Sequence, residues 1–224
     1  MKRVLEVCAI AIVVITSAAT VVIGQSRADI PQQRGISVEM PIAPHSIAMP
    51  DADEEDAFVV VVNETGSLYL GAEPTDPTAL AAAAKSRSPV YLKADARSSY
   101  ENVLRAIDAL RSAGVRSVTL LSTVAREPRS GPPQVPQGME VSVLAASSGT
   151  PILVQLSGSN PELPLVTIDN QQVPWTSLQT ELGRRVQTDH KQVSVAAAGS
   201  LPFADMVRVV DAAAATGARV YIAN

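Results

Sequence analysis

The sequence predicts an α+β protein in which a single N-terminal transmembrane helix is followed by two small tandem domains. Each domain reads ββαβαβ, with its helices packed on one face of a short sheet. Three observations indicate this arrangement. The twenty residues from Val7 to Ser26 carry no charge, two later stretches alternate strand-like and helix-like apolar patterns, and those two stretches resemble each other.

The N-terminal helix is expected over residues 4–24, because about twenty residues at about 1.5 Å each span a bilayer core. Lys2 and Arg3 precede it, so the positive-inside rule places the short tail 1–3 in the cytoplasm and the bulk of the chain outside. A cleaved signal peptide is the alternative, since Ser17-Ala18-Ala19 resembles a cleavage site. The apolar run continues beyond that site, which favours a retained anchor.

Glu6 places a carboxylate inside this apolar run. A charge near the bilayer centre costs about 2.5 kcal/mol or more, so such residues usually serve a function. Helical spacing places Ile10, Val13, Ser17 and Thr20 on the same face, which we expect to contact a protein partner. The alternative is that Glu6, at the start of the run, lies at headgroup level and is solvated.

Composition divides the whole chain into successive segments. They are a cytoplasmic tail (1–3), the transmembrane helix (4–24), a periplasmic tether (25–55), a first domain (56–124), a Pro/Gly-rich linker (125–138) and a second, diverged domain (139–224). The tether is assigned from its prolines and its cluster of acidic residues. The linker is assigned from its four prolines and two glycines.

The two domains look like copies of one unit. Apolar and turn residues recur at an offset of 103 positions: Tyr100, Val103, Ile107, Asp108, Gly114 and Arg116 in the first, Phe203, Met206, Val210, Asp211, Gly217 and Arg219 in the second. We therefore expect a duplicated domain.

Residue patterns predict the elements of each domain. In the first we expect strands at 58–62, 67–70, 90–94 and 118–121, and helices at 79–85 and 99–113. In the second we expect strands at 152–156, 165–168, 193–197 and 219–222, and helices at 177–185 and 203–215. Ser98 and Glu101 suggest a capping box for the longest helix, and Gly114 suits the left-handed position that ends it.

Composition excludes several functional classes. A net charge of −4 argues against a nucleic-acid groove, and 3% aromatic residues argue against base-stacking platforms. One Cys excludes an internal disulfide, and two His give a metal centre little support. Motifs for phosphate binding or nucleophilic catalysis are missing, so we expect neither an enzyme nor a cofactor.

The remaining polar residues suggest local roles. Asp95 follows a predicted strand and precedes a helix, where an aspartate commonly caps a turn. Asp108 and Asp211 are expected to be solvated or paired locally. His45 in the tether and His190 in a polar loop have no carboxylate partner that the sequence indicates.

Several motifs together resemble the ExbD/TolR family. The strongest is Tyr91-Leu92-Lys93-Ala94-Asp95, which is similar to a family strand ending in Arg/Lys-Ala-Asp. It is followed by a helix carrying Tyr100 and Asp108 and ending at Ala113-Gly114. Leu5-Glu6-Val7 falls where the family has Ile-Asp-Val, and the tether motif Val38-Glu39-Met40-Pro41 resembles a short Leu-Pro-containing segment. The second domain matches only as a degraded copy, with Ala196-Ala197-Ala198 replacing Lys-Ala-Asp.

The resemblance implies a function. Members are inner-membrane subunits that couple the proton-motive force to transport or envelope work, as homodimers inside a ring of ExbB/TolQ-like polytopic partners. By position Glu6 would be the proton-coupling carboxylate, and Lys93, Asp95, Tyr100, Asp108 and Gly114 would be family positions of the periplasmic domain. A periplasmic protein or a cell-wall ligand would be the outer partner. The alternative is a membrane-anchored scaffold whose Glu6 never titrates.

Overall fold

The structure is a computed structural model, and it describes residues 36–124, 135–144, 150–158, 163–188 and 192–223. The chain divides into two compact units, 1–30 and 31–224, and the first lies wholly outside the described residues. The predicted transmembrane helix and its residues Glu6, Ile10, Val13, Ser17 and Thr20 therefore lie outside them too. Within the described ranges, every helix is too short or too polar to span a bilayer.

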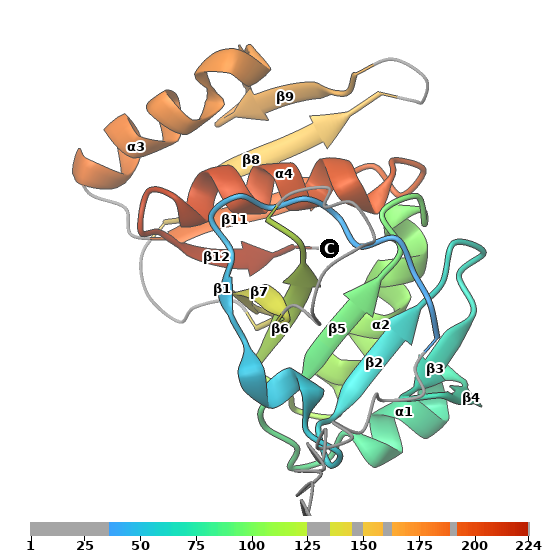
Figure 1. Cartoon of the computed structure of the whole chain (residues 1–224). Helices are drawn as coiled ribbons and strands as arrows, with labels where there is room; N and C mark the ends of the chain where they lie inside the picture. The colour runs from blue at the N-terminus through green and yellow to red at the C-terminus, as the bar shows by residue number, and fades with distance from the viewer. Residues whose placement is uncertain (1–35, 125–134, 145–149, 159–162, 189–191, 224) are drawn as a thin grey trace, which may run out of the picture. The chain divides into compact units, whose positions relative to one another are not determined.

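The described strands join into one twelve-stranded sheet (Figure 1). The strands are β1 (Ile47–Ala48), β2 (Val59–Val62), β3 (Leu68–Leu70), β4 (Glu73–Thr75), β5 (Tyr91–Ala94), β6 (Ser117–Ser122), β7 (Gln137–Ser142), β8 (Ile152–Ser157), β9 (Leu165–Ile168), β10 (Gln171–Val173), β11 (Gln192–Ala197) and β12 (Arg219–Ile222). Their order is β10-β9-β8-β11-β12-β7-β6-β5-β2-β3-β4, and β1 pairs with β7. The helices are α1 (Pro77–Ala83), α2 (Tyr100–Ser112), α3 (Leu178–Thr188) and α4 (Phe203–Ala214), with 3-10 turns at Pro50–Asp53 and Trp175–Ser177.

The two expected domains are the two ends of this one sheet. We call residues 58–124 the first half and residues 150–223 the second half. β7 lies between them, antiparallel to β6 along its whole length and joined to β12 by the single parallel pair Tyr221 and Ser142. The prediction of two separate short sheets is wrong, because β7 lies at the end of the expected linker and continues the sheet from one half to the other.

Each half keeps its helices on one face, as expected. Helix α2 buries Val103, Ile107 and Leu110 and packs against β2, and α4 buries residues such as Val210 and packs against β11 and β12. Strand register explains which residues face the helices. Alternate residues of a strand point to opposite faces, so Val60 of β2 packs under the helices while its neighbours belong to a second, smaller core.

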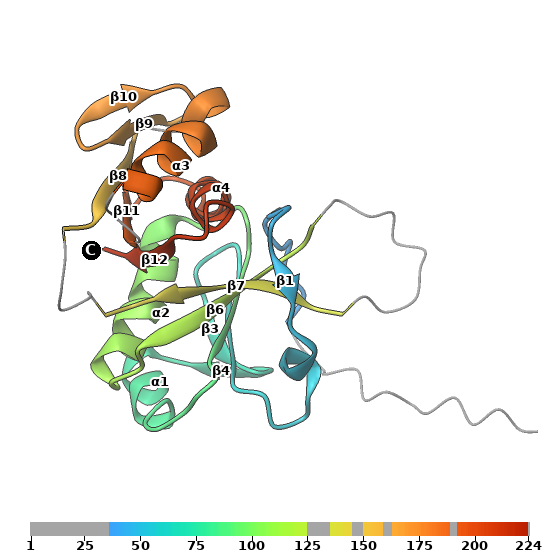
Figure 2. The same cartoon turned by 90° about the vertical axis from the view of Figure 1, so that its left-hand side faces the viewer.

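That smaller core forms under residues 36–57, which we call the strap. The strap covers the face of the first half away from α2 (Figures 1 and 2). The prediction that 25–55 is an extended tether is wrong for the part that begins at Ile36. Ile36, Val38 and Met40 alternate with exposed residues and pack on the sheet, and the strap later contributes β1.

Helix α2 begins differently from the sequence prediction. Its N-cap is Ser99, which makes no side-chain capping bond, and the hydroxyl of Ser98 is buried without a hydrogen-bond partner among the described residues. The predicted capping box is therefore wrong. The other end is as predicted: Gly114 has φ +84°, and the amide of Val115 donates to the Leu110 carbonyl at 3.1 Å.

Candidate functional site

Asp95 is the centre of the candidate site. It follows β5, is 2% exposed, and accepts four hydrogen bonds. The Glu39 amide donates to Oδ2 at 3.0 Å, the Arg97 amide donates to Oδ1 at 3.0 Å, and the Arg97 guanidinium donates to both oxygens at 3.0 Å. Burial alone would raise the pKa of Asp95, but the hydrogen bonds from Arg97 and Glu39 and the charge of Arg97 outweigh it and lower that pKa.

The turn-capping role expected of Asp95 is present, but it is only part of what this carboxylate does. The Arg97 amide bond closes a tight turn, whereas the Glu39 amide comes from the strap, 56 residues away. Next to it the Ala96 amide donates to the Glu39 carbonyl at 2.7 Å. Asp95 therefore joins the start of α2 to the strap.

Lys93, two residues before Asp95 in the sequence, also binds the strap. Its ammonium group donates to the Ile36 carbonyl at 3.2 Å. Burial lowers the pKa of Lys93, and the negative charge of Asp53 opposes that shift. Since Lys93 and Asp95 lie two residues apart, both reach the face of the sheet on which the strap runs.

The tether motif lies in this site as well. Val38 and Met40 pack against Tyr91 and its neighbours, and Pro41 is buried. The Pro41 carbonyl accepts from the Thr123 amide at 2.9 Å, so the strap is bonded to the end of β6 beyond the motif. The structure thus brings together Val38, Met40, Pro41, Lys93 and Asp95, which the sequence placed in two separate segments.

Arg97 belongs to the site and was missed by the sequence reasoning. Besides Asp95, it pairs with Glu64 at 3.1 Å and lies 3.7 Å from Glu39. We call Lys93, Asp95 and Arg97 the latch. The signal in the sequence was an acid followed two residues later by a base, directly after a buried strand.

The other family positions lie elsewhere. Tyr100 is 1% exposed at the start of α2, and its hydroxyl is 3.4 Å from the Ala223 carbonyl of the second half. Burial raises the pKa of Tyr100 far above its usual range. Asp108 pairs with Arg111 one turn along the helix, as the local reading predicted.

His45 and Asp211 form a second attachment of the strap. The His45 amide donates to Asp211 Oδ1 at 2.8 Å, and its Nδ1 lies 2.9 Å from Oδ2. Two sequence expectations are wrong here: His45 does have a carboxylate partner, and Asp211 is 7% exposed and paired across 166 residues. Nothing in the sequence indicated this contact, because its two residues lie 166 positions apart. His190 lies outside the described residues.

We expect His45→Ala to loosen the strap without unfolding the sheet. The change removes the imidazole contact with Asp211 but keeps the backbone bond. Hydrogen exchange followed by mass spectrometry on the full chain should show faster exchange near residues 43–49, with β5 unchanged. Asp211→Asn is the partner variant and should match it. Unchanged exchange in both variants would mean that the strap does not depend on this pair.

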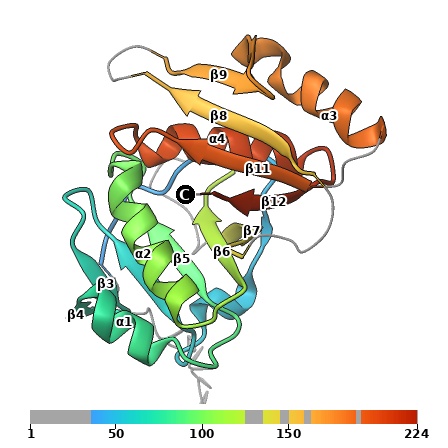
Figure 3. The same cartoon turned by 180° about the vertical axis from the view of Figure 1, so that it is seen from behind.

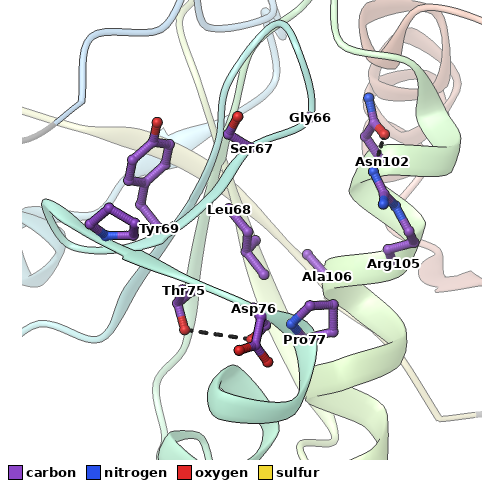
Figure 4. Close-up of a pocket in the computed structure, with 11 residues that line it drawn as sticks. Gly66, Ser67, Leu68, Tyr69, Thr75, Asp76, Pro77, Asn102, Arg105 and Ala106 are labelled. Atoms are coloured by element: carbon purple, nitrogen blue, oxygen red, sulfur yellow. Dashed lines mark hydrogen bonds between the residues drawn. The ribbon is translucent and has the colours of Figure 1, made fainter.

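A half-open pocket of about 390 Å³ lies between the β3–β4 hairpin and α2 (Figure 4). Its charged groups are engaged within the chain. Asp76 Oδ1 accepts from the amides of Thr78 and Ala79 and caps α1, and Arg105 donates to Asn102. Across the described ranges, acidic, His and Cys side chains do not gather into a group that could hold a metal ion.

Residues 25–125 match the family model described as biopolymer transport protein ExbD/TolR. This part of the chain belongs to the ExbD/TolR family. The match covers the strap, the latch and α2, and it ends before β7. No curated protein and no solved structure matches the chain. Membership implies a general role in energy coupling for biopolymer transport, in a family typically associated with the inner membrane and with ExbB/TolQ partners.

Proposed function

We propose that this protein is an inner-membrane, proton-coupled subunit that works with an ExbB/TolQ-like polytopic partner. Residues 4–24 would anchor it, with the N-terminus cytoplasmic and the described residues periplasmic. Glu6 would gain and lose the coupled proton, and the face with Ile10, Val13, Ser17 and Thr20 would contact the partner. A charge that crosses 100 mV gains about 2.3 kcal/mol, enough to drive a change between conformations.

The observation that best supports this proposal is the position of the latch. Lys93 and Asp95 bind the backbone of the strap, and the strap is the first described segment after the expected membrane helix. Any force on the chain from the membrane side would therefore reach the sheet at the latch.

Docking of the strap changes how far the domain can reach. With the strap docked from Ile36, eleven residues (25–35) separate it from the expected membrane helix, and eleven residues extend at most about 40 Å. If residues 36–55 of the strap were released, the thirty-one residues 25–55 would extend to at most about 110 Å. We propose that proton coupling changes the docking of the strap, and that a periplasmic protein or cell-wall ligand is contacted in the extended state.

Two chains would associate through their membrane helices, as a homodimer surrounded by the polytopic partner. We propose no catalytic role and no cofactor for this protein. The alternative is a membrane-anchored periplasmic scaffold without proton coupling. It shares this fold and location, so Glu6 alone distinguishes the two.

Glu6→Gln tests the proposal. We expect it to abolish complementation of a deletion strain, because glutamine cannot exchange a proton, while expression and co-purification of the polytopic partner in mild detergent persist. Glu6→Asp is the matched control, since it keeps the carboxylate, and it should retain function. Full complementation by Glu6→Gln would favour the scaffold.

A further inference from the structure

The N-terminal ends of α2 and α4 meet in the structure (Figure 3). Ser99 and Pro202, the N-cap residues of the two helices, form an antiparallel bridge. The Tyr100 amide donates to the Leu201 carbonyl at 2.8 Å, and the Phe203 amide donates to the Ser98 carbonyl at 2.8 Å. The first residue of each helix is therefore hydrogen-bonded to the loop before the other helix.

A second pair of bonds flanks the first. The Glu101 amide donates to the Gly199 carbonyl at 2.9 Å, and the Ala204 amide donates to the Ala96 carbonyl at 3.0 Å. The first amides of a helix have no partner within it. In both helices these amides are satisfied by the opposite half of the chain.

All four bonds are reciprocal at the offset of the sequence repeat. Every donor and acceptor in the first half corresponds to one in the second: Ala96 to Gly199, Ser98 to Leu201, Ser99 to Pro202, Tyr100 to Phe203 and Glu101 to Ala204. Reciprocal contacts of this kind define an isologous interface, in which two copies meet about a twofold axis. Here the axis passes between Ser99 and Pro202.

Farther from the axis, each of the two helices also contacts a segment outside its own half of the chain. Helix α2 reaches the end of β12, where Arg111 donates to the Ile222 carbonyl at 3.1 Å. Helix α4 reaches the strap beside the end of β6, where Asp211 accepts from His45. Asp211 corresponds to Asp108, which lies one turn before Arg111.

We infer that the first half carries a homodimer-type interface and that the second half of the same chain occupies it. The second half thus takes the place of a second copy of the first. Tyr100, Leu201 and Phe203 are each at most 1% exposed, so the interface is closed. Two chains that associate must therefore use other surfaces, and each chain presents a pseudo-symmetric pair of halves to its partners.

Cross-linking tests this inference in the full chain with Cys8→Ser. The bond pattern makes Ser99 and Pro202 a non-hydrogen-bonded pair, whose Cα atoms lie about 4.5 Å apart, within the range for a disulfide. With copper phenanthroline as oxidant, we expect Ser99→Cys/Pro202→Cys to form an intramolecular disulfide in most molecules. Ser99→Cys alone should stay uncross-linked, because no second copy reaches the axis.

Two outcomes would overturn the inference. One is a covalent dimer from Ser99→Cys alone, which would place two copies of the chain about this axis. The other is a folded double variant that forms no internal disulfide. The control pair Ser112→Cys/Pro202→Cys should not cross-link, because Ser112 lies at the far end of α2, roughly 20 Å along the helix.

Matched proline variants give a second readout if the cysteine variants fold poorly. Glu101→Pro and Ala204→Pro each remove one amide of an equivalent pair, at the second residue of a helix, where no hydrogen bond within the helix is lost. We expect similar falls in melting temperature from both, with Glu101→Ala as the side-chain control. A loss confined to one of the two would contradict a reciprocal interface.

Discussion

Asp95→Ala releases the first part of the strap and lowers the free energy of unfolding by about 2–4 kcal/mol, because the amides of Glu39 and Arg97 lose their charged acceptor. For a chain of this size that corresponds to a fall of about 5–15 °C in melting temperature. Hydrogen exchange should accelerate over residues 36–41 before it does so in β5. The measurement is thermal unfolding together with exchange on the full chain in mild detergent.

The same carboxylate predicts how stability depends on pH. Its pKa is lower in the folded protein than in the unfolded chain, so its contribution is fully present above the unfolded value of about 4 and is lost as the pH falls through the folded value. Asp95→Ala should therefore have a flatter acid limb of the stability curve. Asp56→Ala, which removes an exposed carboxylate of the same strap, is the control. If both variants behave alike, Asp95 does not hold the strap.

Tyr100→Ala should lower the free energy of unfolding by about 3–5 kcal/mol, because it empties the space of a large buried ring where the two halves meet. Tyr100→Phe should cost much less, since it keeps the ring and loses only the long contact of 3.4 Å with the Ala223 carbonyl. Urea unfolding monitored by circular dichroism measures both values.

The equivalent variant Phe203→Ala serves as the comparison for Tyr100→Ala. Phe203 is 0% exposed and follows the bridge at the corresponding position, so we expect a loss of the same size. An equal cost for Tyr100→Ala and Tyr100→Phe would show that the hydroxyl, and not the packing of the ring, stabilises this interface.

Elements with a strong local pattern were predicted closely from the sequence. The β9 and β12 strands have the predicted bounds. Helix α2 is one residue shorter than predicted at each end, and α4 is one residue shorter at its C-terminal end. Their apolar spacing is local, and it matches the period of the element that it forms. In the latch, Lys93 and Asp95 were identified through the family motif, and the position of Asp95 directly after a buried strand fits its contact with another segment.

Short or unusual elements were not predicted. The strap contains prolines and acidic residues, which indicated a tether, although Ile36, Val38 and Met40 alternate as in a strand. β4 and β10 have only three residues each, and β7 begins inside the expected Pro/Gly-rich linker. Such segments have little intrinsic preference, so their structure depends on the neighbour with which they pair.

The sequence by itself determined the strands with a clear local apolar pattern, the main helices, the glycine that ends α2 and the motif that identifies the family, because each depends on residues close together in the chain. Only the tertiary structure decided that the strap docks on Asp95, that Asp211 meets His45, and that each half supplies carbonyls to the other's helix start. Those contacts join residues 56 to 166 positions apart or lie across the interface between the halves. Which amide meets which carboxylate or carbonyl is fixed by the packing of the sheet, and no local pattern encodes it.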